Sequence, residues 1–281
     1  NNQIDAVELN NDEYVEAKND QDIANMISIV PGCCHYHLLF INADMPPFDN
    51  RDFRSAISLS IDREKIANEV FNGLAQKADQ YLFPGLRAYP GLKNPINFDP
   101  QKAKQLFKLF NEAFPSQNEV PDITILSSNS EKFSGIAELI SSDLEEVLGV
   151  KATVSKYKLG KYYVSLEDYK DPAVFIAGYC SDYADAHDFW SLWLPESDYI
   201  FTQLSSLFNS QLIELINNAA STEDTDQRKN FYQQAEEIVV NQDVMAIPLI
   251  WNKRAVLSRP YVHRTDSMLF EHFDEWAILD H

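Results

Sequence analysis

The sequence predicts an α/β fold in which a mixed sheet is flanked by helices, and three observations support it. Helical and strand periods of apolar residues alternate through most of the chain. A strand, a helix and a second strand follow one another over 123–157, which favours parallel pairing through a crossover helix. Hydrophobic residues make up 45% of the 281 residues, enough for a substantial core.

Capping residues and glycines define the elements of the first half of the chain. Asp, Asn and Pro are favoured where helices begin, and Gly where they end. The expected elements are a helix over 50–59 capped by Asp49 or Asn50, a helix from Asp62 to Gly73, a Gly- and Pro-rich surface loop over 83–95, and a helix that begins at Asp99-Pro100.

The second half alternates strands with helices. The long helix has Phe133, Ile136, Ile140 and Leu144 at helical spacing, and Gly149 follows it. The expected elements are a strand over 123–126, a helix over 131–148, strands over 151–157 and 174–177, helices over about 211–220 and 226–241, and two closing strands over 244–251 and 255–258.

Charge and hydropathy exclude several classes of protein. The net charge of −20 disfavours binding to nucleic acid or to an anionic membrane surface, because both would repel the chain. No run of 18 apolar residues exists to cross a membrane. The first residues, Asn1 to Asp5, lack the features of a signal peptide, so we expect a fragment or a processed form.

Three blocks of sequence together resemble the family 5 solute-binding proteins, the dipeptide and oligopeptide binders of ABC importers. The first runs from Pro46-Pro47-Phe48-Asp49 through an Arg54-Ser55-Ala56 helix to Ile61-Asp62-Arg63. The second is Ala177-Gly178-Tyr179-Cys180-Ser181-Asp182-Tyr183-Ala184-Asp185. The third is Tyr232-Gln233-Gln234-Ala235-Glu236, followed by Ile247-Pro248-Leu249. Their order and spacing make a chance match improbable.

The resemblance implies a periplasmic-binding-protein-like fold, of type II and the peptide-binding cluster. In that scheme 1–33 is a remnant of the first lobe, 34–255 is the second, ligand-binding lobe, and 256–281 returns to the first lobe. It also implies an extracytoplasmic, non-enzymatic protein that passes a peptide to an ABC permease. We expect a monomer with no cofactor, and the export signal lies outside this chain.

The second block supplies the expected ligand-binding residues. In relatives, the Asp that corresponds to Asp182 pairs with the α-amino group of the peptide. A carboxylate is suited to bind an ammonium. Tyr179, Cys180, Ser181 and Tyr183 surround it, and the resemblance implies that this backbone pairs with an extended ligand. The alternatives are a surface Asp that caps a turn and a Tyr179 that packs in the core.

At two positions the chain differs from its relatives, so the residues that would hold the C-terminal end of the ligand are not identified. Relatives that bind tripeptides hold the ligand carboxylate with an Arg and a His, where this chain has Ile176 and Phe133. Neither side chain binds a carboxylate, and Lys132 is the neighbouring substitute. The ligand is therefore longer, modified at its C-terminus, or not a peptide.

The three cysteines allow two arrangements. The resemblance implies a disulfide between Cys34, or Cys33, and Cys180, and the alternative is three buried thiols. His35 and His37 share one face of a strand beside them, but no second cluster stands at metal-site spacing, so we expect no metal. A same-fold binder of a nickel-like or haem-like chelate stays an alternative.

An enzyme is the third alternative. Asp182, Asp185, His187 and Asp188 form an acidic segment that could serve a thiol or carboxylate hydrolase. Without a recognisable nucleophile motif, we expect a solvated loop instead, followed by the core rings of Phe189 and Trp190.

Overall fold

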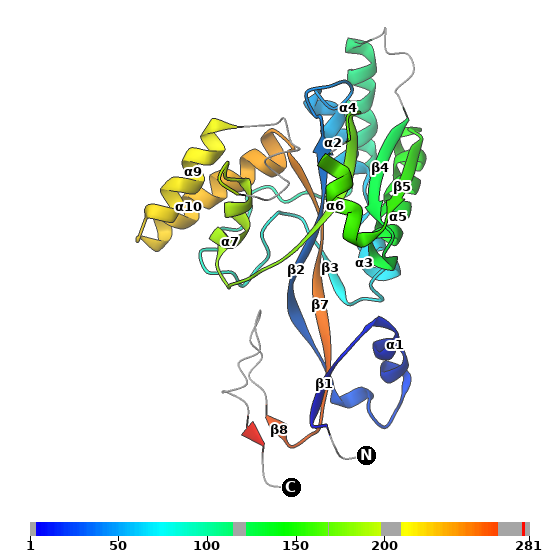
Figure 1. The fold of residues 1–281 in the computed structure, drawn as a ribbon, viewed down its shortest axis with the longest axis vertical. Coiled ribbons are helices and arrows are strands. Elements are labelled where there is room, and N and C mark those ends of the chain that lie inside the picture. Colours follow the sequence, from blue (N-terminus) through cyan, green and yellow to red (C-terminus); the bar gives the residue numbers. More distant parts are fainter. Residues whose placement is uncertain (1–3, 115–121, 168, 198–208, 264–276, 279–281) are drawn as a thin grey trace.

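A mixed β-sheet runs the length of the molecule in the computed structural model and joins a large α/β unit to a small one (Figure 1). The structure describes residues 4–114, 122–167, 169–197, 209–263 and 277–278. Over these residues the sheet has seven strands. Six follow the order β1-β7-β2-β6-β4-β5, and the seventh, β3, pairs with β7. No helix in these ranges is long and apolar enough to cross a membrane.

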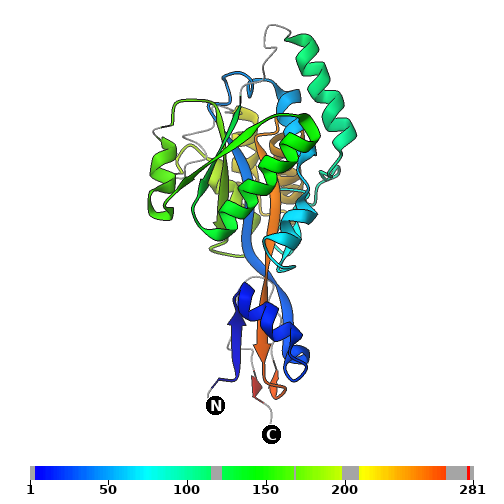
Figure 2. The ribbon, with the colours of Figure 1, turned by 90° about the vertical axis from the view of Figure 1, so that its right-hand side faces the viewer.

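Two long strands connect the units. They are β2 (Ile27–Ile41) and β7 (Ala246–Ser258), which pair antiparallel. In both views they are the blue and orange ribbons that pass through the narrow neck (Figures 1 and 2). The small unit also holds β1 (Ala6–Leu9), α1 (Asn11–Asn19), the 3-10 turn η1 (Ala24–Met26), β8 (Val262–His263) and β9 (Ala277–Ile278).

The large unit covers both faces of the sheet with helices. One face carries α2 (Arg51–Ser60), α3 (Arg63–Glu69), α4 (Pro100–Ala113) and α5 (Glu131–Leu148). The other face carries α6 (Leu159–Glu167), α7 (Ala186–Trp190), the 3-10 turn η3 (Ser191–Trp193), α9 (Ser210–Ser221), α10 (Thr225–Glu236) and the π-helical turn η4 (Glu237–Gln242). The remaining strands are β3 (Ala75–Lys77), β4 (Ile123–Ser128), β5 (Ala152–Tyr157) and β6 (Ala173–Cys180).

The apolar run at the end of β2 explains the two-layer core. Side chains alternate across a strand, so Leu38 and Phe40 enter the core on the α2–α5 side, whereas Leu39 and Ile41 enter the opposite core. All four are at most 1% exposed. Each such side chain contributes roughly 1.5–3 kcal/mol by burial. A strand buried on both faces must read as a continuous apolar run rather than as an alternating one.

The strand–helix–strand unit has the predicted arrangement. β4 pairs parallel with β5, and α5 connects them. The helix spans the predicted residues and ends at Gly149, whose φ of 69° lies in the left-handed region that glycine tolerates. Asn50, Asp62 and Asp99 each accept a backbone N–H at the start of a helix, as their sequence positions indicate.

The structure differs from the prediction at the end of the chain. The two closing strands expected over 244–251 and 255–258 are one strand, β7. Asn252, Lys253 and Arg254 suggested a break because they are polar. They continue the strand because they lie at the neck, where their side chains are only partly buried and their backbones still pair with neighbouring strands.

Candidate ligand-binding site

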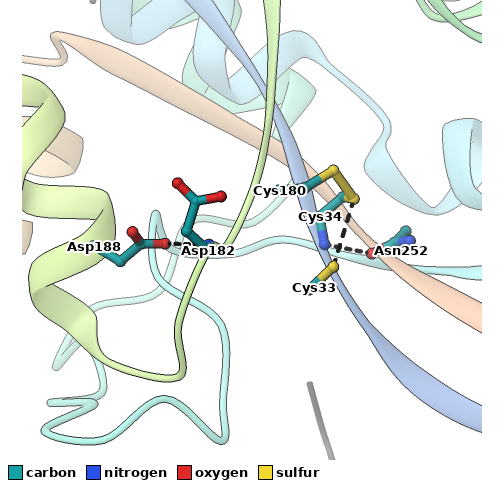
Figure 3. The surroundings of a disulfide bond; sticks show 6 residues. All are labelled: Cys33, Cys34, Cys180, Asp182, Asp188 and Asn252. Atoms are coloured by element: carbon teal, nitrogen blue, oxygen red, sulfur yellow. Dashed lines mark hydrogen bonds between the residues drawn. A yellow bond between two sulfur atoms is a disulfide. The ribbon is translucent and has the colours of Figure 1, made fainter. Parts of the chain in front are cut away.

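The candidate site is the loop that follows β6, beside the neck. The last residue of β6, Cys180, lies opposite Cys34 of β2, and the N–H of Ser181 donates to the carbonyl of Cys33 at 2.9 Å. The loop therefore leaves the sheet at a fixed point, where β2 continues toward the small unit (Figure 3). Two residues later the chain reaches Asp182.

Asp182 presents an exposed carboxylate on an anchored backbone. Its N–H donates to Asp188 Oδ2 at 2.9 Å. The Tyr179 hydroxyl lies 3.3 Å from Asp182 Oδ2 and 3.1 Å from Asp188 Oδ1. Because a hydroxyl has one proton, it donates to one carboxylate at a time. Asp182 thus keeps acceptor capacity that faces solvent.

Asp188 corrects the expectation of a fully solvated loop. Its residue is only 3% exposed, because it begins the buried run of α7 that continues with Phe189 and Trp190. Burial raises the pKa of Asp188, although hydrogen bonds from the Asp182 N–H and the Tyr179 hydroxyl oppose the rise. Burial and the charges of both aspartates also raise the pKa of the Tyr179 hydroxyl, so it stays a donor.

An ion pair clamps the loop to α10. The guanidinium of Arg228 donates to both oxygens of Asp185, at 2.7 Å each. Asp185 also caps α7 by accepting the N–H of His187. Burial acts to raise the pKa of Asp185, but the bonds from Arg228 and His187 outweigh it and leave that pKa lowered. No sequence pattern indicated this pairing, because the partners stand 43 positions apart.

The remaining residues of the second block have distinct surroundings. The Ser181 hydroxyl donates to the carbonyl of Tyr183 at 2.6 Å and is occupied inside the loop. The Tyr183 side chain is 46% exposed. The Tyr179 ring packs edge-on against Phe189 with ring centroids 5.2 Å apart, so Tyr179 serves the core with its ring and the site with its hydroxyl. Cys180 forms a disulfide with Cys34, one of the two pairings that the resemblance implied.

Lys132, the candidate partner of the ligand carboxylate, lies on a different element. It lies in the first turn of α5, with Nζ 5.4 Å from the centroid of the Phe71 ring. Phe71 in turn contacts Tyr36, and Tyr36 lies opposite Gly178 of β6. Lys132 is therefore linked to β6 through two aromatic rings rather than through the loop that carries Asp182.

The two histidines beside the cysteines belong to the core. His35 and His37 are 2% and 0% exposed, and their rings lie 4.6 Å apart among Tyr81 and Phe189. Burial lowers the pKa of His35 to about 4. The two histidines are therefore neutral rings that pack in the core next to the candidate site.

The sequence matches one protein family and is similar to several curated relatives. The family described as bacterial extracellular solute-binding proteins, family 5 middle, matches residues 1–200. A curated relative from Haemophilus influenzae, named heme-binding protein A, is 29% identical over 72% of this chain and 36% of its own length. The dipeptide-binding protein DppE of Bacillus subtilis is 27% identical over 79% of this chain and 40% of its own length. The chain thus spans about two fifths of these relatives.

Solved structures show the fold. The unliganded, open form of a periplasmic murein tripeptide binding protein superposes with a TM-score of 0.78 at 17% identity, over 95% of this chain and 51% of its own. A periplasmic oligopeptide-binding protein from Borrelia burgdorferi gives 0.76 at 22% identity, over 98% of this chain and 54% of its own. With a family match over most of its residues, this chain belongs to the family 5 bacterial extracellular solute-binding proteins.

Proposed function

We propose that this chain is the ligand-binding half of the solute-binding component of an ABC importer, and that it takes up oligopeptides. The observation that carries the proposal is the exposed carboxylate of Asp182 on a backbone anchored by Asp188. Such a group binds a ligand ammonium by charge-assisted hydrogen bonds, each of which contributes about 1.5–3 kcal/mol.

The edge of β6 supports recognition of an extended backbone. β4 pairs with β6 only at Val174 and Phe175, so in the described structure no strand covers the end of that edge. The Ser181 N–H points to β2, and peptide groups alternate along a strand. The N–H and C=O of Cys180 therefore point to the open edge, where a peptide can add as a strand.

The small unit supports a first lobe beyond this chain. Three apolar residues there are exposed: Ile4 by 61%, Val7 by 41% and Ile29 by 44%. Contact with further protein would remove the free-energy cost of exposing these side chains to water. We therefore retain the division into 1–33, 34–255 and 256–281, with hinges at the two strands of the neck. Residues 264–276 and 279–281 of the last segment lie outside the described residues.

The proposed cellular setting follows from the same function. The protein works outside the cytoplasm, as a monomer, and delivers its ligand to a membrane permease without catalysing a reaction. The family description as extracellular solute-binding proteins supports this setting.

One finding favours a second candidate, a haem-like solute. The relative at 29% identity is named a heme-binding protein. For such a ligand the exposed ring of Tyr183 contributes more to binding than the carboxylate of Asp182 does, because a flat apolar solute is held mainly by apolar contacts.

Mass spectrometry of the small molecules released from the full-length protein tests the proposal. We expect peptides with a free α-amino group, and no absorbance from a tetrapyrrole. A solute without an amine would contradict the peptide proposal. A tetrapyrrole would contradict it and also support the second candidate.

A further inference from the structure

Three sulfur atoms meet at the neck. The Sγ atoms of Cys33, Cys34 and Cys180 all lie within 4.8 Å of one another, and that of Cys33 lies 3.9 Å from that of Cys34. Cys34 and Cys180 form the disulfide, while Cys33 is a half-buried free thiol. Figure 3 shows this thiol beside the disulfide, with the Asn252 side chain next to Cys34.

Local backbone geometry brings the adjacent cysteines together. In a regular strand, neighbouring side chains point to opposite faces. Here the pairing of β2 with β7 shifts register between Pro31 and His35, which interrupts that alternation. The N–H of Cys34 donates to the side-chain Oδ1 of Asn252 at 2.8 Å. A Cβ at Gly32 would lie 2.2 Å from that same oxygen, so glycine is needed for Asn252 to reach Cys34.

We propose that, once the disulfide is reduced, these three cysteines bind one thiophilic metal ion of the zinc type. Zinc–thiolate bonds of about 2.3 Å in a tetrahedron place the sulfur atoms about 3.8 Å apart. Cys33 already stands at that distance from Cys34. Cys180 is exposed, so the fourth position of the metal is open to water.

The chemistry balances with a dithiol as the reductant. The dithiol supplies two electrons and two protons, the Cys34–Cys180 bond breaks into two thiols, and the dithiol becomes a disulfide. The metal ion then displaces one proton from each of the three thiols and gains three thiolate ligands. Disulfide and metal exclude each other, so occupancy depends on redox state.

A divalent ion with three thiolates carries one net negative charge. The charged side chains that act on Cys33 are Arg254 and Glu8, which form an ion pair with Nη1 and Oε2 3.5 Å apart. Metal ions and protons compete for the three thiolates, so binding becomes stronger as pH rises.

This site was not expected from the sequence, because Cys33 and Cys34 alone are too few ligands. The third ligand comes from β6, 146 residues away from Cys34 in the chain. Only strand pairing brings it close, since Cys34 and Cys180 are direct partners in the sheet.

Cobalt titration of the full-length protein tests the proposal, with cobalt(II) as a spectroscopic probe for zinc. The protein is reduced with a phosphine, which adds no competing thiol. We expect one cobalt ion per chain with thiolate-to-metal charge-transfer bands, displaced by Zn²⁺, and no such bands for the oxidised protein.

The Cys33→Ser variant is the matched control, because it leaves the disulfide pair intact. After reduction it should bind more than about tenfold more weakly, since changes outside the ligand set alone can reach tenfold. Circular dichroism reports whether the reduced chains remain folded. Equal binding by wild type and variant, absence of the thiolate bands, or unfolding on reduction would each overturn the proposal.

Discussion

Two aspartates of one loop, Asp182 and Asp188, show how position decides the role of a residue. Both are acidic residues of one segment, and the sequence suggests the same solvated environment for each. Asp182 is exposed, whereas Asp188 is buried and its oxygens accept hydrogen bonds from the Asp182 N–H and the Tyr179 hydroxyl. The buried carboxylate orients the exposed one. Sequence alone separates them only through the apolar Phe189 and Trp190, which draw Asp188 inward.

Glu236 gives a prediction about pH at the same scale. It is fully buried and accepts the N–H groups of Tyr81 and Leu82. Its pKa is raised from 4.5 to about 8, chiefly by burial and also by the charges of Asp79 and Glu237, against the lowering effect of the two N–H groups. Between those pH values the unfolded chain releases a proton that the folded chain keeps. The contribution of Glu236 to stability is therefore lost as pH rises toward 8.

We expect Glu236→Gln to remove this dependence. The free energy of unfolding of the variant, minus that of the wild type, should increase between about pH 5 and pH 8, by at most about 1.4 kcal/mol per pH unit. Urea unfolding at several pH values measures the difference, in which the titration of all other groups cancels. A pH-independent difference would mean that Glu236 is ionised in the fold.

At the scale of elements, local signals predicted helices better than strands. The span of α5 follows from its apolar period and from Gly149. The length of β2 does not, because its first third, Ile27 to Pro31, is half-exposed and pairs only with β7 near the far end of the chain. Pairing between distant segments leaves no local pattern. The helices α1 and α6 also had no prediction, although α1 has a capping box made by Asn10 and Glu13.

The candidate site shows the same limit. The second block placed Asp182, Tyr179 and Tyr183 near one another because they are neighbours in sequence. The clamp from Arg228 to Asp185 depends on the packing of α10 against the loop. It was absent from the prediction because no sequence pattern reports a contact between those two elements.

The clamp predicts a selective effect of Arg228→Ala. Removing the guanidinium leaves Asp185 without its two hydrogen bonds, which should lower the free energy of unfolding by about 1.5–3 kcal/mol. The affinity of the full-length protein for a peptide should fall as well, because the loop that carries Asp182 loses an anchor. Urea unfolding and calorimetric titration measure the two effects.

Lys229→Ala is the control for this experiment. It removes the same charge from the next residue of α10, which is exposed. We expect it to change neither quantity by more than about 0.5 kcal/mol. Identical losses in the two variants would show that net charge, not the clamp, supports the loop.

At the scale of the whole molecule, the narrow neck is the feature that matters for function. In the described structure the chain passes between the large and small units through two strands, whose pairing is irregular between Pro31 and His35 (Figure 2). Such a connection lets two lobes rotate as bodies about a few residues. The candidate loop lies beside it, where closure of a first lobe would cover the ligand.

This arrangement predicts that the present chain alone binds weakly. Half of the contacts to an enclosed ligand would come from the other lobe, so we expect affinity at least about tenfold below that of the full-length protein, a loss of about 1.4 kcal/mol or more. Calorimetric titration of both proteins measures it, and circular dichroism checks that the chain is folded. Equal affinities would show that the ligand needs no second lobe.

The central claim is that Asp182 holds the α-amino group of the ligand. Its most direct test is calorimetric titration of the full-length wild type, Asp182→Asn and the exposed control Asp171→Asn with a peptide and with its N-acetylated form. We predict that Asp182→Asn weakens binding of the free-amine peptide by about 10–100-fold, as expected for a charge-assisted hydrogen bond, and hardly changes the acetylated one. Unchanged affinity of Asp182→Asn for the free-amine peptide would contradict the claim.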